Sequence, residues 1–342
     1  MNTKNNIFPA GSETSPDNDS EVFDSMVSSA HLPSDLAQHR LVALGGGTGL
    51  PVILRAAKSL GMKPTAVVSM ADDGGSTGRL RQELNMLPPG DVRNCLTALS
   101  SPSKLEIAHL VDYRFTRGEG INGHSLGNLM LAAAADDMGS FEHAVKLFEK
   151  LLEVEGRVLP SSYEPLILHG FDRKGEEIYG QASLTCSTTA IASVSLSPAN
   201  ASANPEALAA LRKADSVVIA PGSLFTSIIP NLLIPDIIKT LRESTARLVF
   251  CCNVSNMKGE TANFTVKDYI STLEKYGLED RIDAVLLPYS MHDEDSVMHL
   301  ESKGIQVVIT ALAAAQNPQY HDEHKLASAL PAVIALSPDS RE

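Results

Sequence analysis

LVALGGGTGLPVILRAAK, residues 41–58, joins an apolar strand to an amphipathic helix through a glycine-rich turn. The run at 40–45 is mostly apolar, as in a buried strand, and residues 49–60 have the periodicity of a helix. Glycine lets a backbone approach a ligand closely, and the first turn of a helix offers unpaired N–H groups to an anion. This glycine elbow, Gly45–Gly49, is either a phosphate site or a tight turn without a ligand.

The same alternation of strand and helix continues along most of the chain. Further strand-like runs, separated by helical patterns, lie at residues 65–70, 216–220, 247–254, 282–290 and 305–310. Strands that alternate with helices pair in parallel through right-handed crossovers, which predicts an α/β fold with a three-layer, Rossmann-like α/β/α sheet. Residues 165–185 instead predict an antiparallel hairpin, which residues 187–198 continue. We expect one domain over residues 39–338, with a β excursion at about 157–198.

Composition limits the classes of partner. The chain has 342 residues and a formal net charge of −13, which disfavours broad binding to nucleic acid or anionic membranes. Its four cysteines lack the spacing of a zinc site, and no apolar run approaches the roughly 20 residues of a membrane span. We expect a cytoplasmic protein with a disordered extension at 1–38, in which a local device holds any anionic ligand.

The elbow matches neither of two common phosphate motifs. Leu50 occupies the position of the third glycine of a dinucleotide fingerprint, and no Lys-Ser or Lys-Thr pair follows as in a Walker loop. An NAD-dependent oxidoreductase is therefore a weaker hypothesis, because a second catalytic domain is also missing from the pattern.

Acidic side chains follow the next strand. Asp72 and Asp73 precede the turn that contains Gly74, Ser76 and Arg79. In a Rossmann-like sheet an acidic residue here contacts a ribose hydroxyl, and carboxylate oxygens also suit a hard metal ion. The alternative is a solvated turn in which an aspartate caps the following helix.

The segment LPPGDVRNCLTALS, residues 87–100, places charges at a helix start. Asp91 is suited to capping this helix. Arg93 and Asn94 lie in its first turn, where a cation opposes the helix dipole. Arg93 is therefore placed either for an anionic ligand or for an ion pair with Asp91.

Two more strand-to-helix or loop-to-helix turns repeat the glycine-rich pattern. In GINGHSLGNLML, residues 120–131, Ser125 is a good helix cap, and His124 is a candidate for phosphate contact or proton transfer. Gly222 and Ser223 follow the strand at 216–220. If these turns converge with the elbow, a nucleotide diphosphate is the expected occupant.

Six motifs of this sequence occur together, and in order, in a known family. They are GGGTGL (45–50), DDGGSTGRLR (72–81), PPGDVRNCLTALS (88–100), GHSLGNLMLAA (123–133), GRVLP (156–160) and PGSLFTSIIPNLL (221–233). From about residue 40 to 330 the sequence resembles the gluconeogenesis-factor, or YvcK-like, family, which is related in fold to the CofD-like 2-phospho-L-lactate transferases.

The resemblance implies a regulator that binds UDP-sugars, such as UDP-N-acetylglucosamine, or NAD-like dinucleotides. The family is associated with gluconeogenic growth, envelope-precursor supply and cell shape, so a regulated enzyme and a second copy of the chain are the implied protein partners. The ligand-binding residues expected from the motifs are Gly45, Gly46, Gly47, Thr48, Gly49, Leu50, Asp72, Asp73, Gly74, Ser76, Arg79, Asn94, His124, Asn128, Gly222 and Ser223.

Two further features bear on the ligand. In the related transferases acidic residues hold a divalent metal, and the nearest equivalents here are Asp73 and Asp91, which makes Mg²⁺ a candidate cofactor of a transferase. Family members often carry an Arg before a His-Asp pair near the C-terminus, whereas this chain has Tyr320 before His321 and Asp322. The missing cation puts the preferred ligand, or its affinity, in question.

Overall fold

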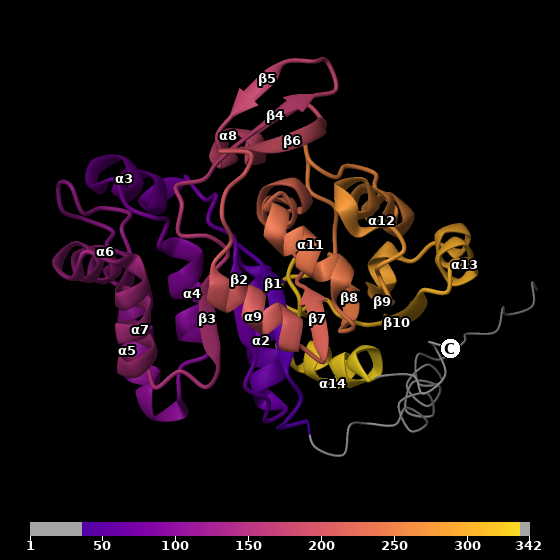
Figure 1. The fold of residues 1–342 in the computed structure, drawn as a ribbon, viewed down its shortest axis with the longest axis horizontal. Helices are drawn as coiled ribbons and strands as arrows, with labels where there is room; N and C mark the ends of the chain where they lie inside the picture. Colours follow the sequence, from indigo (N-terminus) through magenta and orange to yellow (C-terminus); the bar gives the residue numbers. More distant parts are fainter. Residues whose placement is uncertain (1–35, 336–342) are drawn as a thin grey trace, which may run out of the picture.

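A seven-stranded parallel sheet forms the centre of the computed structural model, which describes residues 36–335 (Figure 1). Its strands, in spatial order, are β10 (Gln306–Thr310), β9 (Ala284–Pro288), β8 (Arg247–Cys251), β7 (Ser216–Ile219), β1 (Leu41–Gly45), β2 (Thr65–Val68) and β3 (Arg157–Pro160). Every residue of the central strands β1 and β7 is buried, as expected for a parallel sheet covered on both faces. The predicted α/β class and parallel sheet are confirmed.

Helices cover both faces of this sheet and form a lobe beside it (Figure 1). One face carries α2 (Gly49–Ser59), which packs against α4 (Gly90–Ala98) and α14 (Glu323–Ile334), and the other carries α9 (Pro205–Lys213), α11 (Pro235–Glu243), α12 (Val266–Leu273) and α13 (Glu294–Ser302). The lobe beside α4 consists of α5 (Leu105–Asp112), α6 (Leu126–Met138) and α7 (Phe141–Leu151). The helix α3 (Gly75–Leu84) begins directly after the Asp72-Asp73 turn, but Gly74 is its N-cap residue and no aspartate caps it.

The strand order reverses direction between β1 and β7. From β1 the chain moves outward through β2 to β3, and it then returns to β7 and moves outward on the other side through β8 and β9 to β10. In open α/β sheets, ligands bind outside the carboxyl ends of the strands at such a switch point. The glycine elbow follows β1, and the turn at residues 221–226, which we call the Pro221 turn, follows β7, so both lie at this position.

A small antiparallel sheet stands above the main sheet in Figure 1. It contains β4 (Ile167–Asp172), β5 (Glu177–Tyr179) and β6 (Ile191–Ser197), in the order β5-β4-β6. The predicted excursion therefore exists, but it begins after β3, which pairs in parallel with β2 in the main sheet. Residues 181–185, expected to continue a strand, form the short helix α8 (Gln181–Thr185).

The expected disordered extension lies outside the described residues, apart from 36–38, which form a turn closed by the His39 N–H and the Leu36 carbonyl. Within residues 36–335, no single helix is long and apolar enough to cross a bilayer. The segments Leu224–Leu232 and Pro235–Glu243 reach the length and composition of a membrane span only when they are counted together, and they meet at a bend of 77°.

Candidate functional site

A cavity of about 600 Å³ opens at the switch point, beside the elbow. We call it the elbow cavity. Four segments and one short helix line it: the elbow with Val52, the Pro221 turn with Ser227, the segment after β8, the segment before α14, and α8. The lining residues are Gly47, Thr48, Gly49, Val52, Gln181, Thr185, Pro221, Gly222, Ser223, Ser227, Asn253, Val254, Ser255, Asn256, Met257, Lys258, Gln319, Tyr320 and His321.

Packing within the protein explains why the elbow needs glycine. A Cβ on Gly49 would lie 1.9 Å from the Pro221 carbonyl oxygen, and a Cβ on Gly46 would lie 2.9 Å from Asp91 Oδ2. Gly47 has φ +65°, a backbone conformation that other residues rarely adopt. The glycines bring the elbow against the Pro221 turn and Asp91, so close packing within the protein accounts for them, and the phosphate site stays a prediction.

The charges around the elbow cavity suit an anion. Of its described lining residues none is Asp or Glu, and Lys258 carries the formal charge. Helix α2 begins at Gly49 on the cavity wall, and the N–H groups of its first turn have no acceptor within the helix. Thr48, Ser223 and Ser227 add hydroxyl donors. A protein with a net charge of −13 thus presents a local surface free of carboxylates.

Hydrogen bonds from the segment after β8 fix the Pro221 turn. The Gly222 N–H donates to Asn253 Oδ1 at 2.7 Å, and Asn253 Nδ2 donates back to the Gly222 carbonyl at 2.8 Å. Glu260 Oε1 accepts the N–H groups of Phe225 and Thr226 at 3.0 and 3.1 Å. Burial raises the pKa of Glu260 to about 6, and its Oε2 is a buried atom with no hydrogen-bond partner.

The segment before α14 brings an imidazole and a phenol to the cavity. His321 Nε2 lies 3.0 Å from the Cys252 carbonyl oxygen, and burial lowers the pKa of His321 to about 4. The ring is therefore neutral at pH 7, and because Nε2 must donate to the carbonyl, Nδ1 is an acceptor. Tyr320 is half exposed at the cavity, where its ring can stack on a flat ligand group.

Asp91 lies beneath the elbow rather than at the cap of its own helix. Its Oδ2 accepts the Gly47 N–H at 2.7 Å, and helix α4 has no side-chain cap. Burial, and then the nearby Asp72 charge, raises the pKa of Asp91 to about 7. Burial also raises the pKa of Asp72. The structure therefore brings Asp72 and Asp91 together as a partly buried carboxylate pair.

Asp73 binds the backbone at the start of α8 and not the elbow. Its two carboxylate oxygens accept the N–H groups of Gln181 and Ala182, at 3.0 and 2.7 Å, at the start of α8. Among residues 36–335, no three His, Cys, Asp or Glu side chains are grouped so that they could hold a metal ion. A divalent ion here would fit Asp91 and Asp72 together with oxygens of a bound ligand, because Mg²⁺ commonly takes one or two carboxylates and phosphates. Asp73 does not fit that donor set.

The turn at residues 120–131 forms a separate polar cluster with α3. Ser76 Oγ lies 2.8 Å from His124 Nδ1 and accepts from Asn128 Nδ2 at 3.1 Å, and all three side chains are buried. Burial, with the positive charge of Arg79, lowers the pKa of His124. The Ser125 hydroxyl accepts the Asn128 N–H at 3.2 Å, so its role as the cap of α6 is confirmed.

Arg93 does not pair with Asp91. Its Nη1 lies 3.5 Å from Asp112 Oδ1, and its Nη2 donates to Asn94 Oδ1. Burial lowers the pKa of Arg93, and its buried Nε has no hydrogen-bond partner in the described structure.

The predicted residues thus divide into two groups. Gly47, Thr48, Gly49, Gly222 and Ser223 line the elbow cavity. The others are not among its lining residues; they are Gly45, Gly46, Leu50, Asp72, Asp73, Gly74, Ser76, Arg79, Asp91, Asn94, His124 and Asn128. Leu50 is fully buried in the core, and Arg79 is exposed and donates to the Asn122 carbonyl at 2.7 Å. Two of the four turns meet at this cavity.

Several lining residues were not predicted. The polar run NVSNMK at 253–258 directly follows the apolar strand β8, which is the position where ligand-binding residues of such sheets are expected. That signal was readable in the sequence. Gln181 and Thr185 come from α8, and nothing in the local sequence indicates that Asp73 holds this helix at the cavity.

Comparison with known proteins supports a common ancestry over most of the chain. The family model described as 2-phospho-L-lactate transferase CofD matches residues 41–334. A gluconeogenesis factor from Halalkalibacterium halodurans is 40% identical over 294 residues, which cover 85% of this chain and 87% of the relative. A gluconeogenesis factor from Bacillus subtilis is 38% identical over 307 residues, covering 85% and 96%.

The fold also matches solved structures. A crystal structure of a protein from Bacillus halodurans superposes with a TM-score of 0.80 at 37% identity, covering 86% of this chain and 99% of the other. A second crystal structure from the same organism gives a TM-score of 0.79 at 38% identity, covering 85% and 99%.

Proposed function

Because this chain belongs to the gluconeogenesis-factor family, with its CofD-like fold, we propose that it is a regulatory protein whose elbow cavity binds a UDP-sugar or an NAD-like dinucleotide. The observation that carries the proposal is the position and lining of the cavity. It lies at the switch point of the sheet, its walls include the start of α2, and its described lining contains no carboxylate.

The size of the cavity supports a nucleotide as the ligand. Its volume of about 600 Å³ is within the range of small-molecule and cofactor sites, which is roughly 300–1,000 Å³. The diphosphate would lie against Thr48 and Gly49, where the α2 dipole and free N–H groups favour negative charge. Lys258 would add a charge-assisted contact.

The remaining lining groups suit the uncharged parts of a nucleotide. Asn256 and Gln319 carry both donors and acceptors for a sugar or a base edge, and Tyr320 offers a ring for stacking. Where the family resemblance leads us to expect an Arg, this chain has Tyr320, which offers an aromatic ring in place of a cation. We therefore infer that base or sugar recognition contributes more, and phosphate recognition less, than in relatives with that Arg.

The chemistry of the lining favours binding over catalysis. The described residues around the cavity supply hydroxyl, amide and backbone groups, and His321 is fixed in its neutral form by the Cys252 carbonyl. We propose that ligand occupancy reports the supply of nucleotide sugars in the cytoplasm. It would thereby link gluconeogenic carbon metabolism to envelope-precursor synthesis and cell shape through a regulated enzyme.

Calorimetric titration of the full chain with UDP-N-acetylglucosamine, NAD⁺ and NADP⁺ tests this function. We expect saturable binding of at least one of them, weakened in Lys258→Gln and unchanged in Lys63→Gln, which lies away from the lining residues. No saturable binding of any of the three would remove the proposal.

A second candidate is a Mg²⁺-dependent transferase of the CofD type. The partly buried pair of Asp72 and Asp91 favours it, because such a pair could share a divalent ion with the phosphates of a bound substrate. A metal there would supply charge neutralisation at the transferred group. Phosphorus NMR of the protein with nucleotide-activated substrates and Mg²⁺ distinguishes the two, since turnover lost in Asp91→Asn indicates a transferase.

A further inference from the structure

A second cavity, of about 630 Å³, lies on the far side of α11 from the sheet core, against the turn η3 (Glu274–Leu278). We call it the α11–η3 groove. Its floor consists of half-buried Leu233, Ile238, Tyr276 and Gly277, and its rim of exposed Lys239, Arg242, Glu243 and Lys275. None of these residues lines the elbow cavity.

The floor of the groove is fixed by its own contacts. Gly277 has φ +101°, and a Cβ at this position would lie 2.8 Å from Ile238 Cγ1, so glycine allows η3 to approach α11 closely. The Tyr276 hydroxyl accepts the Val194 N–H at 2.8 Å, which anchors the ring against β6. The groove is therefore built into the packing of three elements.

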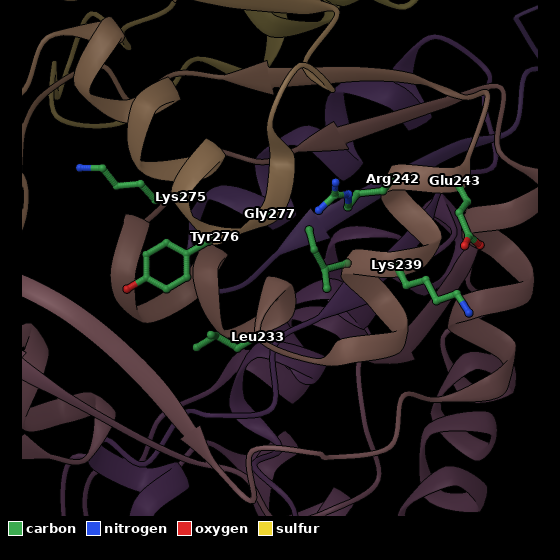
Figure 2. A pocket seen from close by; sticks show the side chains of 8 residues that line it. Leu233, Lys239, Arg242, Glu243, Lys275, Tyr276 and Gly277 are labelled. Carbon is green, nitrogen blue, oxygen red and sulfur yellow. The ribbon is translucent and has the colours of Figure 1, made fainter.

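The rim is basic and its cations are spread along the groove. Figure 2 shows the ammonium groups of Lys275 and Lys239 on opposite sides, with the Arg242 guanidinium between them. In the described structure none of the three forms an ion pair or a side-chain hydrogen bond, and Glu243 is the only carboxylate among the lining residues. Spread cations over an apolar floor match an extended acidic peptide better than a single phosphate group.

We propose that residues 17–24 of this chain, DNDSEVFD, bind in the α11–η3 groove. This stretch contains four carboxylates, at Asp17, Asp19, Glu21 and Asp24, and no basic residue. Between the carboxylates stand Val22 and Phe23, which supply the apolar side chains that the floor accepts. The acidic stretch complements the rim in charge and the floor in polarity.

The chain between residues 17–24 and the start of β1 is long enough for this stretch to reach the groove. β1 begins at Leu41, which pairs with Ser216 of β7, and Ser216 pairs with Arg247 of β8. Arg247 is four positions after Glu243, the last residue of α11. Two strand spacings and this short connection together span about 25 Å, whereas the 12 residues from Asp24 to Leu36, where the described turn begins, reach about 40 Å when extended.

The other terminal segment is a poorer match. Residues 336–342, LSPDSRE, have two acidic side chains opposed by Arg341, and contain no aromatic residue. The charge balance therefore favours the N-terminal stretch as the occupant.

Zero-length carbodiimide cross-linking of the full-length protein tests the proposal, because it joins carboxylates only to lysines in direct contact. We expect mass spectrometry of the monomer band to find residues 17–24 joined to Lys239 or Lys275. These products should be lost when Asp17, Asp19, Glu21 and Asp24 are replaced by their amides, and weakened in high salt. Lys63 and Lys213, near the start of β1, are internal controls.

Three results would overturn the inference. One is the absence of products at Lys239 and Lys275 while other lysines react. Another is a cross-linking yield at Lys63 and Lys213 equal to that at Lys239 and Lys275. Such a result would indicate only random contact of a tethered acidic segment. The third is products confined to the dimer band, which would place the segment of a second copy in the groove. None of these results depends on ligand binding in the elbow cavity.

Discussion

Asp91 Oδ2 accepts the backbone N–H of Gly47 at 2.7 Å, so a carboxylate at the start of α4 holds the glycine elbow that follows β1. The two residues are 44 positions apart. This contact takes one elbow N–H that a phosphate would otherwise use, and it places a titrating group directly beneath the cavity wall. A side chain from a distant helix therefore holds the backbone of the elbow at Gly47.

Replacing Asp91 by Asn should change how stability depends on pH. Burial and Asp72 raise the pKa of Asp91 to about 7, so between the unfolded value of 3.8 and that value the native state holds a proton that the unfolded state has lost. Stability contributed by this group is thus lost as pH rises through the window. Asn keeps an acceptor for Gly47 and does not titrate, so Asp91→Asn should be more stable than wild type at pH 8, by on the order of 1–4 kcal/mol.

Urea unfolding at pH 4 and pH 8 measures this difference, with exposed Asp137→Asn as the control. If Asp91→Asn and wild type differ in their free energy of unfolding by the same amount at both pH values, Asp91 does not titrate as described.

Gly49→Ala should disrupt the contact between the two turns of the cavity. The new methyl group would lie 1.9 Å from the Pro221 carbonyl oxygen, a backbone atom that cannot move alone. We expect a loss of about 1–3 kcal/mol in the free energy of unfolding. Gly74→Ala is the matched control, because its Cβ would meet nothing closer than 3.5 Å. Denaturation of both variants checks the prediction, and equal stability of the two would contradict it.

Glu260→Ala should loosen the Pro221 turn, because it leaves the N–H groups of Phe225 and Thr226 without an acceptor in a buried position. The expected cost is about 2–4 kcal/mol. Glu260→Gln keeps an acceptor oxygen and should retain most of the stability. Amide hydrogen exchange provides the specific readout: Phe225 and Thr226 should exchange faster in the Ala variant only. Equal exchange in both variants would assign Glu260 no role in holding these amides.

The sequence predicted those features whose signal is local. The run at 41–58 indicates strand, elbow and helix, and the structure has β1 at Leu41–Gly45 and α2 at Gly49–Ser59. The prediction that Ser125 caps α6 also depended on neighbouring residues alone. In each case the residues that decide the conformation lie within a few positions of it.

Contacts between distant residues were not predictable in the same way. Asp73 and the start of α8 are more than 100 positions apart, and nothing near Asp73 in the sequence distinguishes a metal ligand from a partner for Gln181 and Ala182. Asp91 likewise suits a helix cap by sequence, but Gly47 is its partner in the fold. A short apolar run also gives no indication of which sheet it joins, which is why β3 was assigned to the excursion.

The central claim is that the elbow cavity binds a nucleotide, and blocking its wall tests this most directly. Thr48 is an exposed cavity residue at the start of α2, whereas exposed Ser59 is at the other end of the same helix. Thr48→Trp and Ser59→Trp therefore add the same bulk to the same helix, inside and outside the cavity.

Calorimetric titration of UDP-N-acetylglucosamine into wild type and both variants is the decisive measurement. We predict saturable binding to wild type and Ser59→Trp, and a loss of at least about tenfold in affinity, or 1.4 kcal/mol, for Thr48→Trp. Equal affinity of all three proteins would place the ligand elsewhere and contradict the assignment of the elbow cavity.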